Sequence, residues 1–279
     1  MITQTPYAPP RVRPTEPGDG LHGHEPRSFA DPAVARERTP ASDALPGQIT
    51  YPLTTRSGRE LSVSLTLKPV FSLAKGQPSA VRLVEEIRIA AGGLRVLEPA
   101  ERARLDLVDI ERLDCEAYHR GLKLLEDSGA TAGVIPTSYR TLARAQGRFA
   151  YLSACLQAPV TEHAAVFAEI TDVDAGTPRE RLAEVAALIG THRRGVMVRL
   201  DRDPRSLPML LADLNVAGAV IDAAGLDAAG WPAFRSYLRA VRSVVRTVLL
   251  DRLDPTWSIS ARDWGATHAV FAPYQGVTV

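Results

Sequence analysis

The chain is poor in several features that mark common classes of protein. It has only two cysteines, Cys115 and Cys155, and their spacing fits no paired zinc or redox motif. No run of roughly eighteen uncharged apolar residues occurs anywhere in the sequence. We therefore expect two small buried thiols without a chemical role, and no membrane insertion.

Charge of one sign is also lacking. The 33 lysines and arginines nearly balance the 32 aspartates and glutamates, so no attraction to nucleic acid extends over the whole chain. The first residues do not combine a basic region with an apolar stretch, as a secretory signal would. These absences predict a cytoplasmic protein that does not bind nucleic acid.

The amino-terminal segment differs in composition from the rest. Nine of the 21 prolines lie in the first 46 residues, with many charges and almost no periodic apolar pattern. Such a segment cannot bury enough surface to order itself. We expect residues 1–48 to form a disordered, proline-rich arm, in which His22 and His24 would make only a weak metal site.

The folded domain is expected over residues 49–279. Apolar residues alternate with polar ones from Leu61 to Lys68, as in a strand with one buried face, and a short turn leads to a second strand over 80–90. A helical pattern follows over 105–125 and ends at Gly129. Six short apolar runs separated by helix-sized spacers then cover 133–138, 165–172, 195–200, 218–222, 247–251 and 268–273.

Short buried runs that alternate with helices indicate parallel strands. With the opening hairpin, the count reaches eight strands in a segment of the size of one α/β barrel. We predict an α/β fold, a TIM-like barrel whose first strand is antiparallel to the others. A doubly wound open sheet remains the alternative.

One strand carries a recognisable motif. The run from Ala165 to Asp172 ends in Glu169, Thr171 and Asp172, and it resembles the Glu-Ile-Thr-Glu strand of EAL-type cyclic di-GMP phosphodiesterases. The resemblance extends from about residue 65 to 273, including a Pro69-Val70 opening. It implies an EAL-type barrel that holds two divalent cations and hydrolyses a cyclic dinucleotide.

Several positions depart from the EAL pattern. The Glu-Ala-Leu signature falls on Arg82, Leu83 and Val84, so an arginine replaces the first metal-binding glutamate. Pro136 occupies the position of the family's asparagine ligand, and Val220 occupies that of its lysine. Aspartates, Asp251 and Asp254, stand in place of two glutamates of the EAL pattern.

The paired aspartates of the EAL family have two matches here. Alignment from Gly195 places them on Asp201 and Arg202, whereas counting back from the next strand places them on Arg199 and Leu200. Asp222 matches the aspartate of the strand after that. Glu169, Asp222 and Asp251 are thus the carboxylates that remain, and we expect Arg82 to pair with Glu169 or a neighbouring acid, without magnesium or another cofactor.

Three functions follow as alternatives. The first is a catalytically inactive, degenerate EAL-like module that regulates signalling by binding another protein. The second is a metal-independent cyclic di-GMP receptor that uses arginines. The third is an unrelated barrel enzyme in which Glu169, Asp201 and Asp222 transfer protons. The candidate residues of the vestigial or ligand-binding site are Arg82, Thr137, Glu169, Asp172, Arg199, Asp201, Asp222, Asp251 and Arg252.

Strand-end hydroxyl and carboxyl groups also have a plain structural interpretation. Thr137 and Thr171 are of the kind that caps a following helix, and Asp222 and Asp251 could do the same. Trp231, Trp257 and Trp264 lie at or near helical spacers, which favours packing over base stacking.

Overall fold

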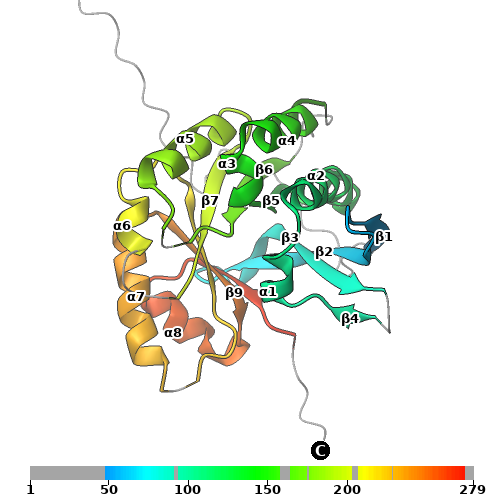
Figure 1. Ribbon diagram of the computed structural model, residues 1–279. Coiled ribbons are helices and arrows are strands. Elements are labelled where there is room, and N and C mark those ends of the chain that lie inside the picture. The colour runs from blue at the N-terminus through cyan, green and yellow to red at the C-terminus, as the bar shows by residue number, and fades with distance from the viewer. Residues whose placement is uncertain are drawn as a thin grey trace, which may run out of the picture.

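A computed structural model describes residues 48–90, 94–157, 164–174, 176–202, 207–227 and 229–273 (Figure 1). All but the last residue of the expected arm, and with it His22 and His24, lies outside the described residues. The strands are β1 (Ile49–Thr54), β2 (Glu60–Ser72), β3 (Gln77–Ile89), β4 (Arg95–Val96), β5 (Ala132–Ser138), β6 (Ala165–Thr171), β7 (Gly195–Leu200), β8 (Gly218–Asp222), β9 (Thr247–Leu253) and β10 (His268–Phe271). The helices are α1 (Pro99–Arg102), α2 (Leu107–Ser128), α3 (Tyr139–Ala143), α4 (Ala145–Gln157), α5 (Arg179–Gly190), α6 (Leu207–Leu211), α7 (Trp231–Val244), α8 (Ser258–Asp263) and the 3-10 turn η1 (Pro255–Trp257).

Eight of the strands close into a barrel. Their order is β2-β10-β9-β8-β7-β6-β5-β3, and β2 also pairs with β3, so the sheet joins its own start. The strand β2 runs antiparallel to both of its barrel neighbours, whereas the neighbouring pairs from β3 to β10 are parallel. This closure confirms the predicted barrel with an antiparallel first strand and rules out the open sheet.

The opening hairpin extends beyond the barrel, which the sequence pattern did not predict. The strands β2 and β3 have 13 residues each. The strand β1 pairs with the start of β2, from Ile49 opposite Leu65 to Thr54 opposite Glu60, and β4 pairs with the end of β3. These short strands therefore widen the sheet at the hairpin and leave the barrel itself at eight strands.

The long helix predicted over 105–125 is α2. Asp106 begins it by accepting a hydrogen bond from the backbone N–H of Val108 at 2.8 Å, and Gly129 ends it in a left-handed conformation with φ 65°. Its apolar residues face the barrel and the hairpin. The segment before it forms the separate helix α1, which lies beside the barrel.

The tryptophans and cysteines are packing residues. Trp231 is buried, with ring centroids 4.5 Å from Trp257 and 5.2 Å from Trp264, which fits the packing interpretation. Cys155 is buried and Cys115 is half-buried, and burial raises the pKa of both thiols. Within the described ranges, no helix is both long and apolar enough to cross a bilayer.

Candidate functional site at the barrel mouth

The barrel interior has two levels that follow from strand geometry. The lower level is apolar and contains Ala80, Val134, Phe167, Met197, Val220 and Leu249. Side chains two residues apart point to the same face of a strand. The next inward positions toward the carboxyl ends of the parallel strands are therefore Arg82, Pro136, Glu169, Arg199, Asp222 and Asp251, and we call this end of the barrel its mouth.

Arg82 is the central cation of this level. Its Nε donates to Glu169 Oε2 at 2.6 Å, and its Nη2 donates to Glu169 Oε1 at 2.9 Å. Its Nη1 donates to Asp251 Oδ2 at 3.3 Å. Arg82 and Asp251 are each 6% exposed and Glu169 is 0% exposed, so this is a buried ion-pair network. The expected contact between Arg82 and Glu169 is confirmed.

Two further arginines complete the network. Arg199 Nη1 donates to Glu169 Oε1 at 3.1 Å, and its Nη2 donates to Asp251 Oδ2 at 2.9 Å. Arg252 donates to both carboxylate oxygens of Asp222, from Nε at 3.1 Å and from Nη2. Arg82, Arg199 and Arg252 with Glu169, Asp222 and Asp251 form what we call the arginine–carboxylate cluster, in which three cations balance three anions.

The cluster shifts the pKa values of Arg82 and Asp251. Burial by itself would lower the pKa of Arg82, but the carboxylates of Glu169 and Asp251 outweigh it and raise that pKa. Burial likewise tends to raise the pKa of Asp251, yet Arg82 and Arg199 overcome this and hold it below the usual value. Both effects keep Arg82 and Asp251 ionised at neutral pH.

The structure separates the two matches for the paired aspartates. Arg199 lies two residues beyond the inner residue Met197 and points into the cluster, whereas Asp201 follows the end of β7 and is exposed. Alternation along the strand explains the difference, because a further step of two residues carries Asp201 out to the rim. Arg199 therefore contributes a second cation to the cluster.

Thr137 and Asp172 lie outside the cluster. Thr137 alternates with the inward Pro136, so its buried side chain faces the helices. Asp172 follows β6 in a left-handed conformation with φ 56°, and its Oδ2 accepts a hydrogen bond from Ser138 Oγ at 2.7 Å. Ser138 also caps α3 by accepting from Arg140 N at 3.2 Å. Thr137 and Asp172 thus lie near the mouth but do not take part in the ion pairs of the cluster.

Asp114 is a buried acid that the sequence analysis missed. Asp114, on the buried side of α2, accepts hydrogen bonds from Thr141 Oγ1 and from the backbone N–H of Ser138 at 3.2 Å. Burial raises its pKa to about 7. In the sequence, Asp114 falls at an inward position among the apolar residues of α2. A charged residue at such a position needs hydrogen-bonding partners, and this was the one sign in the sequence that Asp114 is buried.

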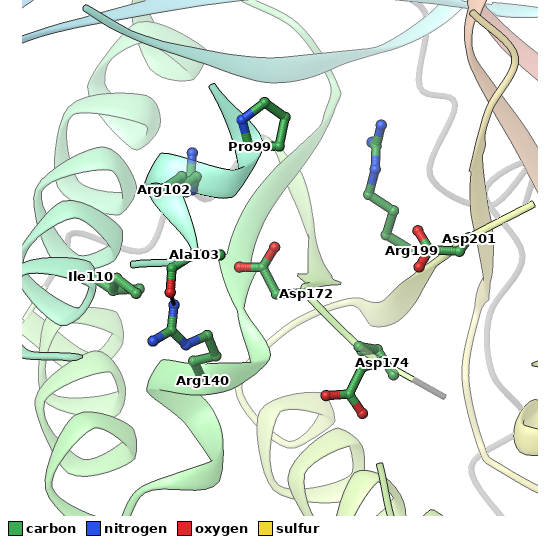
Figure 2. Close-up of a pocket in the computed structure, with 10 residues that line it drawn as sticks. Pro99, Arg102, Ala103, Ile110, Arg140, Asp172, Asp174, Arg199 and Asp201 are labelled. Atoms are coloured by element: carbon green, nitrogen blue, oxygen red, sulfur yellow. Dashed lines mark hydrogen bonds between the residues drawn. The ribbon is translucent and has the colours of Figure 1, made fainter. Parts of the chain in front are cut away.

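A pocket opens beside the cluster. It has a volume of about 430 Å³ and is lined by Pro99, Arg102, Ala103, Ile110, Arg140, Asp172, Val173, Asp174, Arg199 and Asp201. Figure 2 shows that its walls come from the α1 segment, α2, the start of α3, and the ends of β6 and β7. Arg140 Nη1 donates to the carbonyl oxygen of Ala103 at 2.9 Å, which ties the α1 segment to α3, and Arg102 Nη1 lies 2.5 Å from Glu85 Oε2. Arg102 and Glu85 were also missed from sequence.

The residues at the mouth do not fit divalent cations. Magnesium and calcium need several oxygen ligands that converge on one point. The carboxylates of Glu169 and Asp251 are instead directed at guanidinium groups, and two fixed positive charges lie between them. Among the described residues, no group of three or more histidine, cysteine or acidic side chains is arranged to hold a metal.

Solved structures with this arrangement of strands are known. The EAL domain of FimX from Pseudomonas aeruginosa bound to c-di-GMP superposes with a TM-score of 0.57 at 17% identity, covering 75% of this chain and 88% of that one. The complex of the PaMucR phosphodiesterase with c-di-GMP gives a TM-score of 0.58 at 16% identity, covering 75% and 89%. The chain has the EAL fold.

A third EAL structure agrees. The Bacillus subtilis YkuI protein, in complex with its substrate c-di-GMP and calcium, gives a TM-score of 0.59 at 14% identity, covering 74% of this chain and 53% of that one. No protein-family model matches the sequence, and neither does any curated protein. At identities of 14–17%, these structures show the fold of the chain but not its function. The function has to be argued from the residues at the mouth.

Proposed function

We propose that this EAL-fold domain is catalytically inactive and regulates signalling by binding another protein. The observation that carries the proposal is the two-point ion pair between Arg82 and Glu169. Hydrolysis of a phosphodiester by paired cations requires anionic ligands that polarise the substrate through the metals and ionise a water molecule. In this chain, Arg82 and Arg199 neutralise the carboxylates that such cations would use.

A proton-transfer enzyme of another kind receives less support from the same geometry. A general base must be able to reach a substrate proton. Glu169 is 0% exposed and its two oxygens accept three hydrogen bonds from arginines. Asp222 is held by Arg252 and also accepts from the backbone N–H of Ala224 at 2.9 Å. Glu169 is therefore closed to solvent, and both carboxylate oxygens of Asp222, whose side chain is 26% exposed, are held by Arg252.

Turnover is tested with cyclic di-GMP in the presence of magnesium or manganese, followed by chromatography of the products. No linear dinucleotide should form, because the carboxylates remain paired with arginine. Formation of linear product at a rate that scales with protein concentration, and that is lost in Glu169→Gln, would overturn the proposal.

A metal-independent receptor for cyclic di-GMP is a second candidate. The observation in its favour is the pocket, which adjoins the cluster and is lined by Arg102, Arg140 and Arg199. Guanidinium groups bind phosphate through paired hydrogen bonds. The same pocket is also lined by three acids, Asp172, Asp174 and Asp201. These acids repel a dianionic ligand and balance the charge of the three arginines.

Calorimetry separates the two candidates. With cyclic di-GMP and a chelator, the receptor gives a saturable heat that Arg140→Ala weakens, whereas the protein-binding module gives none. Arg120→Ala is the matched control, because Arg120 is half-exposed on α2 and pairs with Glu116 away from the pocket lining.

A further inference from the structure

The exposed face of α7 carries charge of one sign only. The helix contains three arginines, Arg235, Arg239 and Arg242, and no acidic residue. All three are exposed, and no acid in the described ranges forms an ion pair with any of them. At 3.6 residues per turn, these positions lie within a sector of about 60° around the helix axis and span about 10 Å along it. They form one row, which we call the arginine stripe.

Other surface helices neutralise their exposed arginines. Arg120 of α2 pairs with Glu116 at 3.0 Å, and Arg181 of α5 pairs with Glu184 at 2.5 Å. Residues three or four apart on a helix are neighbours, so opposite charges at these spacings stabilise the helix and like charges destabilise it. In the arginine stripe, both spacings join two arginines. A row of repelling cations that gains nothing inside the folded chain indicates an anionic partner outside it.

We propose that the arginine stripe binds an acidic segment of another protein. Carboxylates of the segment accept hydrogen bonds from the three guanidinium groups, and such charge-assisted bonds are stronger than neutral ones. The helix α7 lies on the outside of the molecule next to α6 and α8, and none of its residues lines the pocket (Figure 1). The inference rests on the proposed function, because it specifies the kind of partner that the inactive domain would bind.

The apolar residues of α7 disfavour a membrane surface as the occupant. A helix that binds in the plane of a membrane inserts large apolar side chains next to its basic ones. In α7 the large apolar side chains are buried in the protein, namely Trp231, Phe234, Tyr237, Leu238 and Val241. The exposed residues other than arginine are Pro232, Ala233, Ser236, Ala240 and Ser243. This face therefore offers charge to a partner but no apolar group to insert.

The surroundings of the stripe disfavour nucleic acid. On α8, Arg262 pairs with Asp263 at 3.0 Å, and just after α6, Asp213 pairs with Arg179 at 3.0 Å. These neutral pairs do not widen the positive surface, whereas nucleic-acid binding uses a basic surface that contacts many phosphates. The exposed face of α7 also has no amide or aromatic side chain to read a base or stack on it. A short acidic segment needs only the stripe.

Poly-L-glutamate is a suitable probe for the acidic segment. Fluorescence anisotropy with the labelled polymer at low ionic strength measures its dissociation constant. The triple variant Arg235→Gln, Arg239→Gln, Arg242→Gln should bind about tenfold more weakly than the wild type, because three exposed ion pairs are lost. Glutamine favours the helix nearly as well as arginine, and circular dichroism verifies that the variant is folded.

The matched control is a second triple variant with the same change in net charge, Arg88→Gln, Arg95→Gln, Arg120→Gln. Each of these arginines is exposed and already paired with an acid, so the control should bind the polymer as the wild type does. No saturable binding by the wild type, or equal losses in the two triple variants, would overturn the proposal.

Two further probes separate the classes of partner. Duplex DNA and vesicles of equal parts phosphatidylserine and phosphatidylcholine are titrated with the same proteins. Both should bind more weakly than poly-L-glutamate. If either binds more tightly, and loses that affinity in the stripe variant, the stripe belongs to nucleic acid or to a membrane and the proposal is overturned.

Failure of this proposal can be distinguished from failure of the proposed function. If the stripe does not bind the acidic polymer, the turnover result is unchanged, and an inactive domain would bind its partner through another surface. If linear dinucleotide forms, the domain is an enzyme, whatever the affinity of the stripe.

Discussion

The guanidinium group of Arg82 and the carboxylate of Glu169 lie side by side, joined by hydrogen bonds of 2.6 and 2.9 Å across the mouth of the barrel. They come from β3 and β6, which are 87 residues apart in sequence and separated in the sheet by β5. A fork of two parallel hydrogen bonds is the strongest common form of ion pair. It fixes an arginine where this fold could otherwise direct an acid toward a cation.

Removal of Arg82 should strongly destabilise the fold. Arg82→Met leaves Glu169 buried with only Arg199 as a charged partner, and breaking a buried ion pair from one side costs about 3–5 kcal/mol. The free energy of unfolding from urea titration measures the loss.

The control lies on the same strand. Arg88 pairs with Glu86 at 2.7 Å, but both side chains are more than 40% exposed, at 42% and 46%. An exposed pair contributes about 0–1 kcal/mol, so Arg88→Met should change little. Equal losses in the two variants would show that burial of the Arg82 pair has no energetic consequence.

Replacement of Arg82 by an acid and of Arg199 by an amide should create a binding site for a divalent metal ion. In the double variant Arg82→Glu, Arg199→Gln, the carboxylates of Glu169 and Asp251 lose their guanidinium partners and gain an acidic neighbour. Weak sites for hard cations have dissociation constants of about 10⁻⁴–10⁻³ M, and we expect calcium or magnesium to bind in this range. Isothermal calorimetry measures it, with Arg88→Glu as a control for added charge.

The wild type should give no saturable heat with either cation. A wild-type site for magnesium with micromolar affinity would contradict the proposed inactivity directly. A folded double variant without binding would show that the carboxylates do not converge on one point, whatever charge stands between them.

The contribution of Asp114 to stability should fall as pH rises toward neutrality. In the folded chain, burial raises the pKa of this carboxyl to about 7, whereas its ordinary value is 3.8. Between these values the folded state holds a proton that the unfolded state has released. His268, whose pKa burial lowers to about 4, contributes an opposite slope. The contribution of Asp114 to the free energy of unfolding should decrease with increasing pH in this window, by up to about 1.4 kcal/mol per pH unit for one proton.

Asp114→Asn should remove that slope, since asparagine does not titrate and can still accept from Thr141 and the Ser138 N–H. Urea unfolding at several pH values from 4 to 7 measures it. A fall in stability with rising pH that is as steep in Asp114→Asn as in the wild type would assign the proton to another group.

The tryptophan cluster should stabilise the carboxyl-terminal half of the barrel. Trp231 is 3% exposed and packs against Trp257 and Phe234. Trp231→Ala should cost about 3–5 kcal/mol through lost contacts and a cavity. Met209→Ala is the control, because Met209 is 70% exposed and should change stability by less than about 0.5 kcal/mol. Urea unfolding compares the two.

Much of the fold could be predicted because its signals are local. The alternation from Leu61 to Lys68 and the apolar runs ending at residues 138, 172, 200 and 222 gave the strands, and their order along the chain gave the barrel. The strands β1 and β4 were missed, since Ile49–Thr54 is short and carries a proline, and Arg95–Val96 has two residues. Both take their conformation from pairing with a long neighbour.

The site was predicted only in part. Resemblance and spacing brought out six residues that the structure joins in one cluster: Arg82, Glu169, Arg199, Asp222, Asp251 and Arg252. They also offered Thr137, Asp172 and Asp201, whose side chains do not enter it. Asp114, Glu85 and Arg102 left no clear signal, because each depends on a partner from a distant element.

The sequence by itself determined which residues alternate along each strand, and therefore that an arginine occupies the inward position of β3 and an acid that of β6. Only the tertiary structure decided that these charges meet. Closure of the barrel sets β3 two strands from β6 and three from β9 in the other direction, and this brings Arg82 within hydrogen-bonding distance of both Glu169 and Asp251. Local chain geometry specifies the direction of each side chain, whereas the distance between two charges depends on how the whole sheet curves.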